Sequence, residues 1–141
     1  MLAVGSRRNA RERALSLLYE ADLKGSVVSR VLAELPVPPQ RYAAEIASGV
    51  EQHADEIDGM IARHAIDWSL ERMPVVDRAI LRMATFELGW RQDVPTSVVI
   101  SEAVELAKAY STGESSGFVN GMLAAISREL RGEEYKLGTR P

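Results

Sequence analysis

The chain has 141 residues, of which 46% are hydrophobic, and this length and composition fit one globular domain with its own core. It contains no cysteine, which excludes disulfides, thiolate metal ligands and a cysteine nucleophile. The formal net charge of −3 argues against a protein that binds nucleic acid over its whole surface, because an acidic surface repels a polyanion.

The basic charge is concentrated near the N-terminal end. Residues 1–13 contain four arginines and one glutamate, a balance of +3, so the other residues carry −6. This asymmetry indicates a local patch that contacts phosphate or an acidic protein, although a solvated first helical turn would have the same composition. We see neither a signal-peptide core nor an apolar run long enough to span a membrane, and we expect a cytoplasmic protein.

Apolar residues at three- and four-residue spacing predict a first helix over residues 10–23, which Gly25 ends. A short second helix over 27–35 ends before a proline-rich linker, because proline cannot continue a helix. Residues 40–66 are predicted to form one interrupted helix or two consecutive helices, with a polar break at 53–56.

Proline and glycine also delimit the second half of the chain. Pro74 opens a central helix, because proline fits the first helical turn. After Pro95 we predict a helix over 99–110, then a polar loop over 111–117 and a last helix to about Leu130.

No segment alternates with a period of two over a useful length. We therefore predict an all-α fold of about seven helices in one domain, 1–141, made of two small helical bundles over about 6–66 and 67–131 and a tail at 132–141. Five aromatic residues are expected in its core because large rings more often fill cores than bind ligands: Tyr19, Tyr42, Trp68, Phe86 and Trp90. Leu70 is expected there too.

One enzyme motif matches the chain. Residues 113–117 fit the G-x-S-x-G elbow of hydrolases, but a predicted helix rather than a strand precedes them and no histidine follows His64. We interpret the segment as a loop in which Ser115 and Ser116 cap the last helix. His53 and His64 lack the spacing of a metal motif, so we predict no metal, no cofactor and no catalysis.

Two features of the last helix admit a functional reading. Phe118 could offer a ring face to an unpaired base and Asn120 an amide to a base edge, although periodicity alone favours a core position for Phe118 and a helix-packing role for Asn120. Gly117 and Gly121 lie one turn apart, which indicates close approach of another backbone or a ligand, with packing as the simpler cause.

Charged residues at the start and in the middle of the chain also have helical spacing. Arg7 and Arg11 are one turn apart, so we expect them to project together with Arg8 at a helix end whose dipole favours anions. In the central helix, Glu87 and Arg91 have the order and spacing of an i,i+4 ion pair.

Four ordered motifs resemble the NusB family of transcription antitermination factors. They are Arg7-Arg8-Asn9-Ala10-Arg11 followed by residues 14–19, residues 76–82 with 87–88 and 93–95, residues 102–108, and Phe118-Val119-Asn120-Gly121. The resemblance implies a seven-helix fold without catalysis. It also implies binding of boxA RNA of ribosomal RNA operons together with ribosomal protein NusE, within an elongation complex that holds other Nus factors.

The resemblance also implies which residues bind. RNA binding maps to the first helix and to the loop before the last one, at Arg7, Arg8, Arg11, Glu114, Ser115, Ser116, Phe118 and Asn120. Partner binding maps to the central helix, at Arg82, Phe86 and Glu87. Family members often have tyrosine in place of Phe86, and some have a basic residue in place of Gly117, so this chain lacks a hydroxyl and a positive charge at those positions.

Three alternatives stay open at this stage. A helical adaptor that binds only protein would use its arginines to engage acidic side chains. The RNA-binding appendage of a ribosomal RNA cytosine methyltransferase is disfavoured by length and by the absence of a methyl-donor glycine motif and of cysteine. A homodimer, as some relatives form, could cover the arginine motif.

Overall fold

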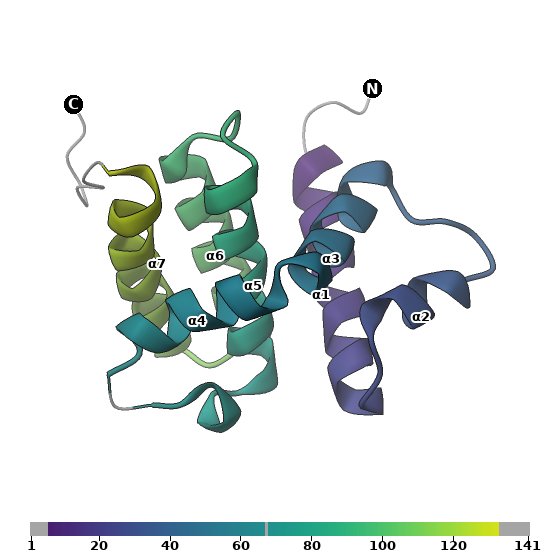
Figure 1. Ribbon diagram of the computed structural model, residues 1–141, viewed down its shortest axis with the longest axis horizontal. Coiled ribbons are helices and arrows are strands. Elements are labelled where there is room, and N and C mark those ends of the chain that lie inside the picture. Colours follow the sequence, from purple (N-terminus) through teal and green to yellow (C-terminus); the bar gives the residue numbers. More distant parts are fainter. Residues whose placement is uncertain (1–5, 67, 133–141) are drawn as a thin grey trace.

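The computed structural model describes residues 6–66 and 68–132, and these residues form an all-α fold (Figure 1). Its helices are α1 (Ser6–Lys24), α2 (Val28–Ala33), α3 (Arg41–Gln52), α4 (Ala54–His64), the short 3-10 helix η1 (Leu70–Arg72), α5 (Val75–Trp90), α6 (Thr96–Tyr110) and α7 (Ser115–Arg131). The predicted all-α fold is confirmed. Of the predicted tail, only Gly132 belongs to the described residues.

Several helix ends coincide with the proline and glycine signals. Pro74 and Pro95 are the N-cap residues of α5 and α6, so α6 begins three residues before the predicted helix. Gly25 and Gly132 follow α1 and α7 with φ of 62° and 67°, the left-handed conformation that glycine adopts without steric cost. The predicted break within residues 40–66 is a single residue, His53, between α3 and α4.

The helices form two groups (Figure 1). Helices α1, α2 and α3 pack together, and α5, α6 and α7 form the other group. Helix α4 packs mainly on α5 and α7, whereas the predicted boundary near residue 66 leaves it with the helices that precede it. The chain thus crosses from one group to the other at His53.

One hydrophobic core continues through both groups. Ala14 of α1 and Ile46 of α3 belong to the same buried cluster as Ile80, Ile100 and Leu123 of the second group. A smaller cluster holds α2 on α1 and α3, through Leu17, Ala21, Val28, Val31 and Ala47. Helix α5 is therefore buried on several sides, and α1 is fixed against it.

The prediction for aromatic residues is only partly right. Phe86 is buried, and Tyr42, Trp90 and Leu70 pack half-buried against the core. Tyr19 and Trp68 are 39% and 38% exposed, so their predicted core positions are wrong. Trp68 lies in the segment between α4 and η1, outside any helix face directed at the core, and its ring contacts Phe118 edge-on.

Candidate functional site

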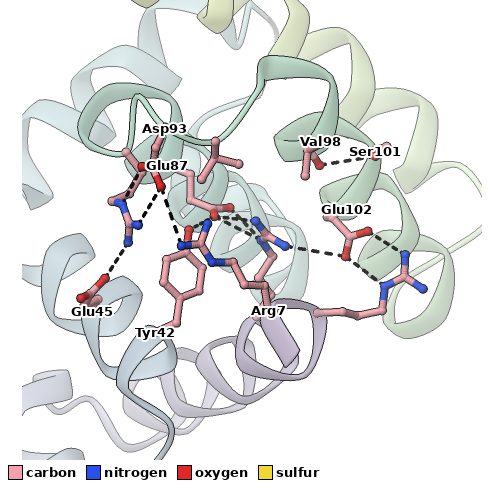
Figure 2. Close-up of polar contacts among 12 residues, drawn as sticks. Arg7, Tyr42, Glu45, Glu87, Asp93, Val98, Ser101 and Glu102 are labelled. Carbon is pink, nitrogen blue, oxygen red and sulfur yellow. Dashed lines mark hydrogen bonds and ion pairs between the residues drawn. The ribbon is translucent and has the colours of Figure 1, made fainter. Parts of the chain in front are cut away.

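Arg7 and Arg8 lie at the solvent-exposed start of α1, with side chains 48% and 60% exposed. Arg8 donates two hydrogen bonds to Glu102 of α6, from Nε to Oε1 at 3.1 Å and from Nη2 to Oε2 at 2.7 Å. The Arg7 guanidinium lies 4.3 Å from the centre of the Tyr42 ring and 3.7 Å from the Asp93 carboxylate (Figure 2). Two cations are thus accessible, each beside a carboxylate.

Arg11 does not project with them, and that expectation is wrong. It is only 4% exposed, and its guanidinium donates to both carboxylate oxygens of Glu87 at 2.9–3.2 Å. The Tyr42 hydroxyl donates to the same carboxylate (Figure 2). The helical spacing of Arg11 is local information, whereas its burial depends on the packing of α1 on α5, between residues 76 positions apart.

The ion pairs of Arg11 with Glu87 and of Arg8 with Glu102 shift the pKa values of the groups around them. Burial, and then the charge and hydrogen bond of Glu87, raise the pKa of Tyr42 far above its usual value, so its hydroxyl stays a neutral donor. Burial acts to lower the pKa of Arg11, but the hydrogen bonds and charge of Glu87 raise it overall. Hydrogen bonds from Arg8 hold the pKa of Glu102 below its usual value. At neutral pH both arginines and Glu102 are therefore charged.

Arg91 completes the surface beside Tyr42 but does not pair with Glu87 as predicted. Its guanidinium donates twice to Asp93 at 3.0 Å and once to Glu45 at 2.6 Å. It also lies 4.8 Å from the centre of the Tyr42 ring. The predicted i,i+4 pair is absent because Glu87 points into the core toward Arg11, while Arg91 ends α5 at the surface.

The loop before α7 is held by hydrogen bonds to a buried carboxylate of α5. Asp77 of α5 is buried and accepts hydrogen bonds from the hydroxyls of Ser111 and Ser115, the latter at 2.8 Å. The N-cap residue of α7 is Glu114 and no side chain caps the helix, so the predicted caps are wrong: Ser115 bonds to Asp77 instead. Asp77 holds the loop while Glu114 is exposed and Ser116 half-buried.

The start of α1 and the loop before α7, the two predicted RNA-binding regions, are connected by contacts between α1 and α6. Arg8 contacts Glu102 in the middle of α6, and Tyr110 at its end donates to Glu12 at 3.2 Å. We call these four residues the α1–α6 seam. The loop follows Tyr110 directly, so it lies beyond the end of α6, whereas Arg8 lies beside the middle of that helix.

The predicted residues of α7 do not share one face. Ser116 and Asn120 are one turn apart and lie on the same side, whereas Phe118 lies on another. The Phe118 ring meets Trp68 with centres 5.4 Å apart and planes at 78°. Asn120 is half-buried, and its side chain makes no hydrogen bond with a described residue.

Gly117 and Gly121 are not explained by close packing. No described atom lies within 4 Å of a Cβ built at either position. Both border an open groove of about 610 Å³ between α4 and α7, which Trp68 and Phe118 also line. The interpretation that a neighbouring helix requires these glycines is therefore wrong.

Of the three residues predicted to bind a protein partner, only Arg82 reaches the surface. It is half-buried, and its guanidinium donates to both oxygens of Asp58 at 2.8 and 3.0 Å. A groove of about 260 Å³ lies beside this pair. Phe86 and Glu87 are buried, although the Phe86 ring lines an open groove of about 590 Å³ together with residues of α3.

The sequence does not predict the side-chain contacts that three residues make at the candidate site. The sequence predicts Tyr42 only as a core ring, and it places Glu102 and Asp77 only within family motifs. Their contacts join helices far apart in sequence, and no local pattern reports such contacts. A carboxylate within a polar motif on an otherwise apolar helix face, as at Asp77, is the one available signal.

Within residues 6–66 and 68–132, no helix is long and apolar enough to cross a membrane. No group of three or more metal-ligating side chains in these ranges is arranged to hold an ion.

The sequence and the structure both have close counterparts. Residues 8–128 match the profile of the NusB family. The transcription antitermination protein NusB of Streptomyces griseus is 45% identical over 130 residues, which cover 86% of this chain and 91% of the relative. The protein of the same name from Clavibacter sepedonicus is 47% identical over 133 residues, covering 88% and 97%.

Two solved structures have the same fold. The structure described as T. maritima NusB superposes with a TM-score of 0.80 at 35% identity, covering 87% of this chain and 91% of that one. A structure of antitermination factors NusB and NusE in complex with dsRNA gives a TM-score of 0.74 at 30% identity, covering 87% and 96%.

Proposed function

This chain belongs to the NusB family, and from that premise we propose that it is a non-enzymatic transcription antitermination factor. It binds boxA RNA of ribosomal RNA operons together with ribosomal protein NusE, in an elongation complex with other Nus factors. It acts in the cytoplasm, where bacterial transcription takes place. The related NusB–NusE–RNA complex supports both binding partners.

The exposed pair Arg7 and Arg8 is the observation that carries this proposal. In a chain with a net charge of −3, these adjacent guanidinium groups on the first turns of α1 offer phosphate an accessible cationic site. Guanidinium forks bind phosphate oxygens in pairs, and the N-terminal end of a helix attracts anions. Arg11 acts indirectly, because its bonds to Glu87 fix α1 on α5 and thereby orient the pair.

The RNA runs from this pair along the α1–α6 seam toward the loop before α7. Glu114 is exposed in that loop, and Ser116 and Asn120 offer polar groups to unpaired bases beside it. Phe118 lies on a different side of α7, so a base that stacks on it must be splayed around the first turn of the helix. Asp77 and Ser115 support the loop from inside.

NusE docks on the face of α5 that carries Arg82. The groove beside the Arg82–Asp58 pair offers it a polar rim, and the buried Phe86 and Glu87 support that face from within. NusE would extend the RNA surface, because the cationic site on this chain alone is small. RNA affinity should therefore rise in its presence, and equal affinity with and without saturating NusE would contradict this coupling.

Fluorescence anisotropy with labelled boxA RNA tests the RNA site. We expect Arg7→Ala/Arg8→Ala to bind more weakly than the unmodified protein and to have a log–log salt slope shallower by about 1.4, because each single-strand phosphate contact contributes roughly 0.7. A matched control, Arg30→Ala/Arg72→Ala, removes two exposed arginines outside the proposed site and changes the net charge equally.

Three outcomes are informative. Weaker binding in both double variants would mean that net charge rather than a site attracts the RNA. Unchanged binding in Arg7→Ala/Arg8→Ala would move the site elsewhere. If NusE assembles with the protein while no variant binds RNA, the chain is an adaptor that binds only protein. Light scattering with and without RNA then tests whether a homodimer competes for the same surface.

A further inference from the structure

In the free protein, both exposed arginines of the proposed RNA site, Arg7 and Arg8, already contact carboxylates. Arg8 and Glu102 form a two-bond pair, with the shorter bond 2.7 Å long. Arg7 is held more loosely, with 3.7 Å between its Nη2 and Asp93. A phosphate that binds Arg8 through the same two nitrogens must therefore displace Glu102, because a guanidinium edge accommodates one such group at a time.

Glu102 is fixed in position more firmly than Arg8. Its side chain is 15% exposed on α6, compared with 60% for Arg8. Glu102 also lies 3.9 Å from Nη1 of the buried Arg11, which keeps a positive charge beside it when Arg8 leaves. Displacement thus moves the exposed arginine and leaves the carboxylate in place beside a second cation.

We propose that Glu102 is an affinity-setting residue that competes with RNA phosphate for Arg8. This inference rests on the proposed function and adds an exchange step to it. In the free protein, Glu102 occupies the Nε–Nη2 edge of Arg8, where a phosphate would otherwise bind through two hydrogen bonds. RNA binding replaces that carboxylate by a phosphate, and Glu102 keeps the longer contact with Arg11, which stays paired with Glu87.

The exchange makes the site selective for ligands that bind at several points. A ligand with a single phosphate gains one charge-assisted contact at Arg8 and loses an equivalent one, so its net gain is small. An RNA that also contacts Arg7 and the loop before α7 gains contacts for which it displaces no two-bond pair. Glu102 therefore favours extended RNA over isolated anions.

Glu102→Gln tests this inference, because the amide keeps the shape of the side chain and removes the charge that holds Arg8. We expect boxA RNA to bind about two- to fivefold more tightly, the range that exposed ion pairs of this kind correspond to. The measurement is anisotropy at 0.15 M salt, where the Debye length of roughly 8 Å limits long-range charge effects.

Two controls isolate the local exchange. Glu71→Gln removes the same charge at an exposed residue of η1 and should change the affinity little. In an Arg8→Ala background, Glu102→Gln should have no larger effect than Glu71→Gln, because the arginine that is competed for is gone. Thermal melting of each variant checks that the fold is kept.

The outcomes separate this inference from the function it rests on. If Glu102→Gln and Glu71→Gln bind RNA equally, or if Glu102→Gln binds more weakly, the competition is overturned and Glu102 instead has no role or positions Arg8. A gain that persists in the Arg8→Ala background also overturns it. If the unmodified protein binds no RNA with or without NusE, the proposed function fails and the exchange fails with it.

Discussion

Arg11 and Glu87 form a buried ion pair at the junction of α1 and α5, and Tyr42 of α3 bonds to the same carboxylate. Both charged side chains have at most 5% of their surface exposed. Taking two charges out of water is unfavourable, so such a pair is maintained by its hydrogen bonds rather than by charge alone. Its role is to fix the α1 helix that carries Arg7 and Arg8.

Removal of one member of this pair should be far more harmful than removal of both. We expect Glu87→Ala to lower the free energy of unfolding by about 3–5 kcal/mol, because it leaves the Arg11 charge buried without its partner. Arg11→Met/Glu87→Met should lose much less, since apolar side chains of similar size often replace a buried pair at little cost. Urea denaturation of the variants measures both effects.

The half-exposed pair Arg82–Asp58 provides the control for that experiment. Asp58→Ala removes a two-bond partner of an arginine at the surface, where solvent and salt screen the charges. Its effect should be at most about 1 kcal/mol. If Glu87→Ala were no more destabilising than Asp58→Ala, the Arg11–Glu87 pair would not hold α1 as we infer.

At the scale of helices, two glycines that both lie inside a helix differ in whether a neighbouring helix packs against them. Gly49 of α3 allows Phe86 of α5 to pack against the α3 backbone: a Cβ there would lie 2.1 Å from Cε1 of the Phe86 ring. Gly121 of α7 has no described atom within 4 Å of the same construction. One glycine is required by packing, and the other is not.

Alanine at these two glycines should therefore change stability in opposite directions. Gly49→Ala forces Phe86 or α3 to move and should destabilise the protein by about 1–3 kcal/mol. Gly121→Ala should stabilise it by about 0.5–1 kcal/mol, the usual advantage of alanine inside a helix. Thermal or urea unfolding compares the two variants, and destabilisation by Gly121→Ala would mean that α7 needs the glycine for a reason inside the fold.

Helix number and helix ends could be predicted from the sequence because the signals for them act over a few residues. Pro74 and Pro95 restrict the backbone next to them, and Gly25 adopts a left-handed conformation without steric cost. Whether a given charged residue is exposed or buried could not be predicted in this way. Arg7 and Arg11 have equivalent helical spacing, yet only Arg11 meets a carboxylate on the buried side of α5.

The candidate site was predictable to the same extent. Arg7 and Arg8 are exposed as expected, and among the described residues they contact Glu102, Tyr42 and Asp93 at the start of α1. Phe86 and Glu87 are not at the surface, because α5 is covered by α1 and α3 as well as by α6 and α7. A central helix with neighbours on most sides has few positions left for a partner.

At the scale of the whole molecule, the two groups of helices are joined by a continuous core. Buried residues of α1 and α3 belong to the same cluster as those of α5, α6 and α7, and the Arg11–Glu87 pair crosses the same junction. Loss of either group would expose apolar surface of α5 and strand a buried charge. The two groups should therefore not be stable independently of each other.

This continuity predicts a single cooperative unfolding transition. Trp90 stacks on His53 at the junction of the two groups, whereas Trp68 contacts Phe118 of α7. In a Trp90→Phe variant, tryptophan fluorescence therefore reports on the second group through Trp68, while far-UV circular dichroism reports on all helices. In urea the two signals should give the same midpoint and the same free energy of unfolding, as expected for two-state behaviour. A circular dichroism transition that precedes the fluorescence change would mean that α1–α3 unfolds first, and that Arg7 and Arg8 stand on a group with its own stability.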